Sequence, residues 1–433
     1  MTIDPHAPPA TRSIAESERL WERACRVIPA GTQTLSKAPS QFVDGVSPKF
    51  LVRGSGCHVW DVDGNEYIDY PMALGPIMLG YDYPPVTAAV IAQLHEGTTF
   101  TLMHPKEVEL AERLVDLIPC AERVRFAKNG ADATGGAIRA ARALTRREHV
   151  IATGYHGYHD WYVASTERDA GVPRLHRELI HTVPFDDLPA LEAALSAHQP
   201  AAVIMEIPAS EPGEGYLQAA IDATHRHGAV FVLDEIVTGF RYALGGAQEL
   251  YGIVPDLACF GKGMANGFPL SAVVGSAAAM EAFEEIFFSM TYSGETMSLA
   301  AALATLDVLE SEPVLEHIWA RGQQLRSGVR SLAAQASFEV TLVGNPPRSA
   351  ITFSGSDVDP NELRALFLQE THKRGVLFGV PIFPTYSHTE ADIKQTLAVI
   401  EAAFERMETA YLGGDVASHL EGAPPGVVFR THN

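Results

Sequence analysis

Two side chains in this sequence have the chemistry of a site that handles carbonyl compounds. Lys262 follows the apolar run 257–260 and is flanked by glycines, which leave room for a bulky ligand. An amine in an apolar, confined setting has its charged form disfavoured, and it then becomes a nucleophile toward aldehydes. Asp234 ends the apolar run 231–233, where a carboxylate is costly unless a cation meets it.

The two residues together predict a ligand. A protonated pyridine nitrogen would be a suitable cation for Asp234, and pyridoxal 5'-phosphate needs such a nitrogen in order to act as an electron sink. Lys262 alone would more often be a solvated surface lysine. Its glycine-bounded setting and its pairing with the aspartate upstream reverse that expectation, so both residues are predicted to be catalytic.

A phosphate site is predicted in residues 126–134, which run from an apolar segment into a helical pattern. The first turn of a helix offers unpaired backbone N–H groups, and with the helix dipole they suit a phosphate monoester. Asn-Gly turns often serve turn geometry alone. The prediction that phosphate binds at Asn129, Gly130 and Ala131 is stronger because the same predicted sheet carries the lysine and the aspartate. Ligands bind such sheets at the carboxyl ends of the strands.

Further candidate contacts lie in three other segments. Tyr155 and His156 belong to the aromatic run 155–162, which could stack on a planar ring or form ordinary packing. The histidines of that run match no common ligand spacing, and we expect no metal site in the protein. Glu206 is a second strand-end carboxylate, and taken alone it would be structural. Thr291 precedes a predicted long helix, where its hydroxyl could equally serve a ligand or the turn.

The composition limits the class of protein. The chain has 433 residues, of which 46% are apolar and 20% charged, so it can bury a substantial core. A net charge of −21 argues against binding to nucleic acid or to an anionic membrane, since both need basic patches. Four widely separated cysteines, and the lack of an apolar signal or membrane-length run, predict a cytoplasmic protein.

The order of apolar runs predicts an α/β fold. From about residue 105, helical patterns separate most of the strand-like runs at 123–127, 149–153, 201–207, 229–236, 257–260 and 271–275. Continuous apolar strands between helices indicate a mainly parallel sheet covered on both faces. Near the N-terminus, residues 13–16 have the form of a capping box that would start a helix ending near Ile28. Residues 59–69 predict a hairpin with an Asp-Gly turn.

Three regions are expected along the chain. Residues 1–75 would supply an N-terminal arm, a helix and the hairpin, all part of a small lobe. Residues 76–310 would form the large cofactor-binding domain. Residues 311–433 would complete a small α+β domain, with short strands at 338–344 and 350–353 and helices near 360–374 and 389–411.

These motifs together resemble the class III aminotransferases of fold type I, most closely the branch around glutamate-1-semialdehyde 2,1-aminomutase. The resemblance extends from about residue 28 to residue 400 and is most specific in 233–241 and 260–262. It implies that Lys262 is the Schiff-base lysine and that Asp234 meets the pyridine nitrogen of the cofactor.

The same resemblance implies the remaining contacts. Tyr155 would stack on the cofactor ring, Ile236 would pack against the opposite face, and residues 129–131 would hold the phosphate. A threonine of the neighbouring subunit also reaches the phosphate in such enzymes, and Thr291 occupies that place. The chain is therefore expected to form a homodimer with shared active sites.

The chain departs from the aminomutase pattern on the substrate side. Lys37 stands where an arginine is expected, Leu74 where a tryptophan is expected, and 383–388 replaces a glutamate-bearing stretch. Ser210 and Glu211 replace an expected Gly-Asn pair after Glu206. Arginine binds a carboxylate through two hydrogen bonds whereas lysine supplies only a point charge, so the substrate contact differs.

The leading hypothesis is an aminotransferase that moves an amino group between a small-molecule donor and a carbonyl acceptor by a ping-pong mechanism. The runner-up is an aminomutase that moves the group within one molecule. A racemase or decarboxylase of the same fold comes third, and a silent cofactor-binding protein fourth. A nicotinamide dehydrogenase is disfavoured because no G-x-G-x-x-G motif follows an early strand.

Overall fold

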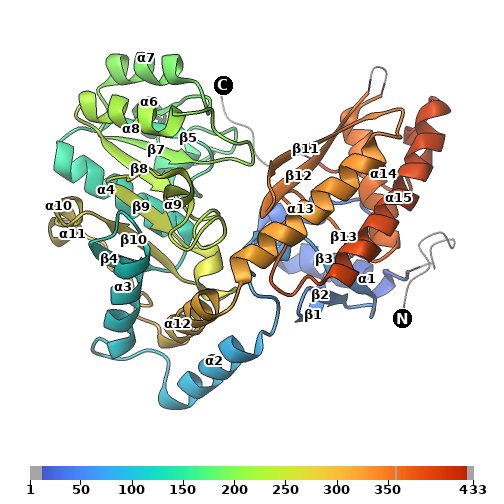
Figure 1. Ribbon diagram of the computed structural model, residues 1–433, viewed down its shortest axis with the longest axis horizontal. Helices are drawn as coiled ribbons and strands as arrows, with labels where there is room; N and C mark the ends of the chain where they lie inside the picture. Colours follow the sequence, from blue (N-terminus) through green and yellow to red (C-terminus); the bar gives the residue numbers. More distant parts are fainter. Residues whose placement is uncertain (1–11, 356–357, 427–433) are drawn as a thin grey trace. The chain divides into compact units, whose positions relative to one another are not determined.

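Short apolar runs become the strands of a seven-stranded sheet with the order β4-β10-β9-β8-β7-β5-β6 (Figure 1). The neighbouring strands β6, β5, β7, β8 and β9 pair in parallel, whereas β10 runs antiparallel to both β9 and β4. The strands are β4 Arg123–Ala127, β5 Val150–Thr153, β6 Ile180–Thr182, β7 Ala202–Glu206, β8 Val230–Asp234, β9 Leu257–Phe260 and β10 Ser271–Gly275.

The interior of this sheet explains the unbroken apolar runs. Every residue of β5, β9 and β10 is buried, as are the first four residues of β7 and the last four of β8. Strands covered on both faces need apolar side chains on both sides, so their sequences do not alternate. The predicted α/β fold with a mainly parallel sheet is confirmed. The sequence reading missed β6, which has only three residues and lies at the sheet edge.

Helices surround this sheet (Figure 1), and α4 contacts β8, β9 and β10. The helices of this part of the chain are α2 Pro84–Glu96, α3 Pro105–Leu117, α4 Gly130–Thr145, α5 Asp160–Val163, α6 Arg174–Leu179, α7 Leu188–His198, α8 Tyr216–Arg226, α9 Ala247–Tyr251, α10 Ala277–Met280, α11 Ala282–Glu285 and α12 Thr296–Ser311.

The computed structural model describes residues 12–355 and 358–426. The chain divides into two units, of which one contains the seven-stranded sheet and consists mainly of Pro84–Leu315 together with Gly75–Met78. The other contains the chain up to Leu74, Leu79–Tyr83 and the chain from Glu316. Residues 1–11 of the predicted N-terminal arm lie outside the described residues.

The second unit holds a four-stranded sheet of order β1-β2-β3-β13 and a two-stranded hairpin of β11 and β12. The predicted hairpin is confirmed, because β2 pairs with β3 antiparallel across the Asp-Gly turn. The elements are α1 Ala15–Val27, β1 Leu51–Ser55, β2 His58–Asp61, β3 Glu66–Asp69, α13 Val314–Ala333, β11 Glu339–Asn345, β12 Arg348–Ser354, α14 Pro360–Lys373, β13 Val376–Leu377 and α15 Glu390–Leu412.

The start of α1 differs from the prediction. No side chain at the N-cap of α1 bonds its first turn, so the predicted capping box is wrong. The carboxylate of Asp63, from the turn between β2 and β3, instead accepts hydrogen bonds from the backbone of Glu16 at 2.8 Å and Ser17 at 2.9 Å. A charged acceptor from a distant segment satisfies these N–H groups better than a local hydroxyl would.

Candidate active site

Three of the predicted site residues lie at the carboxyl ends of three adjacent strands. Glu206 ends β7 and Asp234 ends β8, and the two are paired in register. Asp234 also pairs with Cys259 of β9, and Lys262 comes two residues after that strand ends. Because these strands are parallel, their ends meet at one edge of the sheet. The fold therefore brings together an amine and two carboxylates that the sequence spreads over 57 positions.

Asp234 is held by a histidine inside the protein. His156 Nδ1 lies 2.8 Å from Asp234 Oδ2, and the two residues are 1% and 3% exposed. Asp234 Oδ1 accepts a hydrogen bond from the backbone N–H of Ile236 at 3.1 Å. His156 Nε2 lies 3.1 Å from the carbonyl oxygen of Thr153. The carboxylate is thus fixed in orientation, and its remaining lone pairs can accept a proton donor from a ligand.

The turn from β4 into α4 presents two free donors. Asn129 is the N-cap of α4, and its carbonyl accepts hydrogen bonds from the N–H groups of Asp132 and Ala133 at 3.1 and 3.3 Å. Among the residues that the structure describes, the N–H groups of Gly130 and Ala131 have no acceptor. Two free donors at the N-terminus of a 16-residue helix are suited to a phosphate.

Ile236 packs between this turn and the loop that carries the lysine. A Cβ atom at Gly130 would lie 3.1 Å from the Ile236 side chain, and one at Gly261 would also lie 3.1 Å from it. Lys262 itself has a φ of 36°, in the left-handed region that lysine rarely adopts. A side chain at Gly130 or Gly261 would therefore press against Ile236.

Tyr155 and Glu206 form a second contact at this edge. The backbone N–H of Tyr155 donates to Glu206 Oε2 at 3.1 Å, and the Tyr155 ring meets Tyr162 edge-on with 5.6 Å between centroids. Burial, together with the nearby carboxylates Glu206 and Asp234, raises the pKa of the Tyr155 phenol. Tyr155 nevertheless remains 46% exposed, so part of its ring is open to a ligand.

Thr291 is exposed and makes no hydrogen bond to another residue in the described ranges. It lies in the turn that leads to α12, where Glu295 accepts from the N–H groups of Met297 and Ser298 at 2.7 and 3.2 Å. Lys128, beside the phosphate turn, forms a half-buried ion pair with Glu295 at 3.0 Å. The hydroxyl of Thr291 is therefore open to another molecule.

Several residues that position the site were not found by sequence reasoning. Ser271 Oγ donates to the Asn129 carbonyl at 2.7 Å, and Thr134 Oγ1 donates to the His156 carbonyl at 2.8 Å. Glu235 is fully buried and accepts from Thr238 and from the N–H groups of Ala247 and Gln248. Most of these contacts join residues that lie far apart in the sequence, so local patterns do not reveal them. Only the double carboxylate at 234–235 could have drawn attention to Glu235.

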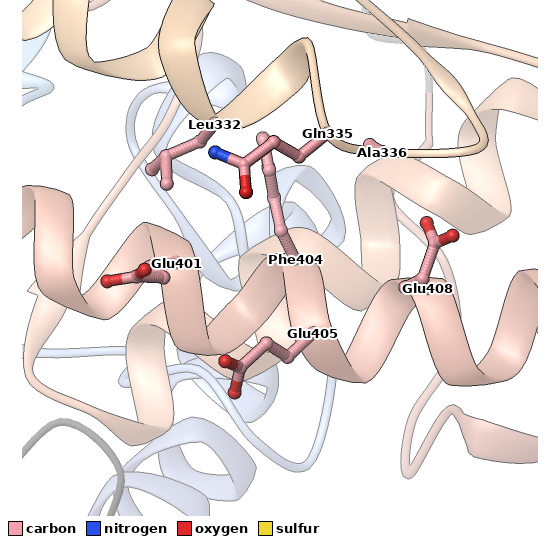
Figure 2. Close-up of a pocket in the computed structure, with 7 residues that line it drawn as sticks. All are labelled: Leu332, Gln335, Ala336, Glu401, Phe404, Glu405 and Glu408. Atoms are coloured by element: carbon pink, nitrogen blue, oxygen red, sulfur yellow. The ribbon is translucent and has the colours of Figure 1, made fainter.

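A separate cavity of about 190 Å³ lies between the end of α13 and α15 (Figure 2). Three glutamates of α15 line it, with Phe404 from the same helix and Leu332 of α13. Glu408 is already engaged with the N–H and hydroxyl of Ser337. The lining offers no amine and no phosphate-binding turn, so this cavity does not belong to the candidate active site.

Residues 43–404 match the Aminotransferase class-III family. The chain belongs to this family. The aminotransferase is 34% identical over 410 residues to the 3-aminobutyryl-CoA aminotransferase of Cloacimonas acidaminovorans, a match that covers 91% of this chain and 98% of that protein. It is 36% identical over 361 residues to the glutamate-1-semialdehyde 2,1-aminomutase of Methanothrix thermoacetophila, covering 79% and 83%.

A solved structure supports the same assignment. The aminotransferase superposes on the FumI protein of Sphingopyxis sp. MTA144, in its pyridoxal-phosphate internal aldimine form, with a TM-score of 0.87, 30% identity and coverage of 96% and 99%. Class-III aminotransferases use pyridoxal phosphate. The predicted family, fold type, enzyme class and cofactor are therefore confirmed. No helix in the described part of the chain is both long and apolar enough to cross a membrane.

Proposed function

We propose that this class-III aminotransferase transfers an amino group between two separate substrates, with Lys262 and Asp234 as its catalytic residues. The observation that carries the proposal is the buried Asp234–His156 pair, which lies at the same sheet edge as Lys262 and the open donors of residues 130–131. A carboxylate, an amine and a phosphate-binding turn at one edge match the three reactive parts of pyridoxal phosphate.

The residues have distinct roles in this proposal. When bound, pyridoxal phosphate supplies an aldehyde for amines and a ring that accepts electrons. Residues 129–131 would hold the phosphate, and Tyr155 and Ile236 would pack against the ring. Glu206 accepts a hydrogen bond from the backbone of Tyr155 and so positions that segment. Asp234, oriented by His156, keeps a proton on the ring nitrogen. Lys262 Nζ takes a proton from the substrate carbon and returns it at another position.

Transfer between separate substrates is favoured by the residues that depart from the aminomutase pattern. Asp69 accepts from the Tyr81 hydroxyl at 2.7 Å and from the N–H of Met72. Burial raises the pKa of Asp69 to about 6, although the hydrogen bonds from Tyr81 and Met72, and then the charge of Lys37, oppose that rise. Residues 72–74 are three successive left-handed residues, with φ values of 45°, 55° and 74°. Such strain is typical of functional segments, and Leu74 belongs to this one.

The substrate class follows from these substitutions. Lys37 offers a single point charge, whereas the arginine of the aminomutase pattern would bind a carboxylate through two hydrogen bonds. Leu74 occupies less space than the tryptophan of that pattern. We therefore propose a donor or acceptor that is bulkier than an α-amino acid and whose amino group need not adjoin a carboxylate. The 34% identity with a 3-aminobutyryl-CoA aminotransferase supports β-amino thioesters as the first compounds to assay.

We also propose that the enzyme is a homodimer with shared active sites. Apolar side chains of α2, of the segment that follows it and of the start of α3 face solvent in the single chain: Ile91 51%, Leu94 53%, Phe100 47%, Leu102 78%, Met103 81% and Val108 60% exposed. A monomer rarely exposes such a series, so a second copy of this chain is the proposed cover. The open hydroxyl of Thr291 supports its predicted contact with the partner's phosphate.

The proposed compartment is the cytoplasm. All four cysteines are free thiols, and three of them, Cys57, Cys120 and Cys259, are buried. Burial raises the pKa of the Cys120 thiol to about 12, so this residue stays protonated and unreactive. Free thiols of this kind suit a reducing compartment.

The aminomutase remains the second candidate, since the 36% identity with such an enzyme favours it. The discriminating experiment adds a donor amine to the cofactor-loaded enzyme without a carbonyl acceptor. A transferase should convert one equivalent of cofactor to its amino form and then stop until an acceptor is added. If glutamate-1-semialdehyde alone turns over to 5-aminolevulinate faster than any two-substrate transfer, the enzyme is an aminomutase.

A further inference from the structure

Three histidines that lie far apart in the sequence meet at the outer edge of the seven-stranded sheet. His149 immediately precedes β5, His181 lies in the edge strand β6, and His198 is the last residue of α7. One nitrogen of each ring lies within 4.8 Å of the others. His149 Nδ1 is 3.0 Å from His181 Nε2. Their spacing matches no sequence motif, so this group was not foreseen.

The three rings lie in close contact with one another. The rings of His181 and His198 stack with 3.4 Å between centroids and an interplanar angle of 11°. Within the described ranges, no carboxylate forms an ion pair with any of the three rings. A close group of imidazole lone pairs without an acidic partner is suited to a soft or borderline cation.

We propose that His149, His181 and His198 bind a divalent transition-metal ion, with Zn²⁺ as the natural probe. Tetrahedral Zn²⁺ with bonds of 2.0–2.1 Å would separate its nitrogen ligands by roughly 3.3 Å. His149 Nδ1 and His181 Nε2, 3.0 Å apart, are already close to that distance, and the stacked rings of His181 and His198 would rotate so that both face the ion. His198 also lies at the C-terminus of α7, where the helix dipole favours a cation.

The proposed site is structural and separate from catalysis. His149 lies at the amino end of β5, and Asp234 lies at the carboxyl end of β8, which runs in the same direction through β7. The three histidines and Asp234 therefore lie toward opposite ends of the parallel strands. All three ring residues are half-buried, which leaves a fourth ligand position for water. The ion would clamp the three-residue edge strand β6 to β5 and α7.

The test uses the untagged, cofactor-loaded full chain after treatment with a chelator. Equilibrium dialysis against Zn²⁺ should show one bound ion per chain, and Zn²⁺ should raise the apparent melting temperature. His149→Gln, His181→Gln and His198→Gln should each weaken binding by at least about tenfold. Each variant should keep its aminotransferase activity and its far-ultraviolet circular dichroism, which shows that it has folded.

Two control variants make the assignment falsifiable. His225→Gln alters a histidine of α8 that pairs with Asp256 at 2.9 Å outside the group, and it should leave Zn²⁺ binding unchanged. Cys57→Ser alters the other group of metal-ligating side chains in the described residues, Cys57, His58 and Asp392. If only Cys57→Ser abolishes binding, or if the wild-type chain binds no stoichiometric Zn²⁺, the three-histidine site is refuted.

Discussion

His156 Nδ1 and Asp234 Oδ2 lie 2.8 Å apart, and both side chains are almost completely buried. The second ring nitrogen of His156 faces the carbonyl of Thr153, which ties the ring to the end of β5. The carboxylate therefore cannot rotate away from the position that a ligand ring would take. A fixed charge that needs no reorganisation during the reaction is the most effective form of electrostatic catalysis.

Asp234→Asn should lower kcat by at least about 100-fold while the cofactor stays bound, because a preorganised charge is lost but the shape is kept. Turnover and the cofactor absorption spectrum of the purified variant measure the two effects. Asp222→Asn, which changes an exposed carboxylate on α8, is the matched control and should be near wild type. Near-normal turnover in Asp234→Asn would refute the proposed role.

His156→Asn should act through Asp234. We expect kcat to fall by roughly tenfold and the free energy of unfolding to drop by about 1–3 kcal/mol, since a buried carboxylate loses its partner. The pH at which the cofactor absorbance titrates should also move in this variant. A purely structural histidine would lower stability without moving that titration.

Lys262→Ala should abolish turnover, and borohydride should attach the cofactor to the wild-type peptide that contains Lys262. The reason is that this amine is the nucleophile and proton carrier in the proposed mechanism. Mass spectrometry of the digested protein locates the adduct. Lys128→Ala removes a half-buried lysine that pairs with Glu295, and it should keep the Lys262 adduct. Attachment at any other lysine would contradict the assignment.

Thr291→Ala should weaken cofactor retention in the homodimer, whereas Thr291→Ser should restore it because the hydroxyl is kept. Subunit mixing provides the sharper measurement. In a hybrid of Thr291→Ala and Lys262→Ala chains, one site has both native residues and the other has neither. Random mixing should therefore recover about a quarter of the wild-type activity at limiting cofactor. No recovery after mixing would show that the two residues serve a site within one chain.

The pair of His58 and Asp392 should make stability depend on pH. The hydrogen bond with Asp392 raises the pKa of His58, with the nearby Glu66 assisting and burial opposing. Burial works to raise the pKa of Asp392, but hydrogen bonds from His58 and Thr389 outweigh it and hold that pKa below its ordinary value. The stability contributed by His58 is present below about pH 6.5 and is lost as the pH rises through its folded pKa.

The contribution of Asp392 has the opposite sign: it is present above about pH 4 and is lost in strong acid. The pair should therefore contribute most between these limits, by about 2 kcal/mol. Denaturant unfolding of wild type and His58→Gln at pH 5.5 and pH 9 measures it, and the difference should be larger at pH 5.5. An equal difference at both values would exclude the charged pair as its source.

Much of the fold could be read from the sequence because the sheet is buried on both faces. The runs that became β5, β7, β8, β9 and β10 are short and apolar, as expected for strands that are covered on both faces. The family also followed from local segments, since 233–241 and 260–262 carry their signal in adjacent residues. β6 escaped prediction because three residues at a sheet edge carry no pattern.

Local sequence could not predict the contacts between residues that lie far apart in the chain. Asp63 caps α1 from a turn that lies far along the chain, and this contact replaced the predicted capping box. His156 is the partner of Asp234, but no local pattern near either residue indicates this pairing. The two residues meet because β5, β7 and β8 pack in parallel, which brings their ends together. His149, His181 and His198 are likewise brought together only by the packing of β5, β6 and α7. Residue types and local runs determined the chemistry, and the sheet decided which side chains meet.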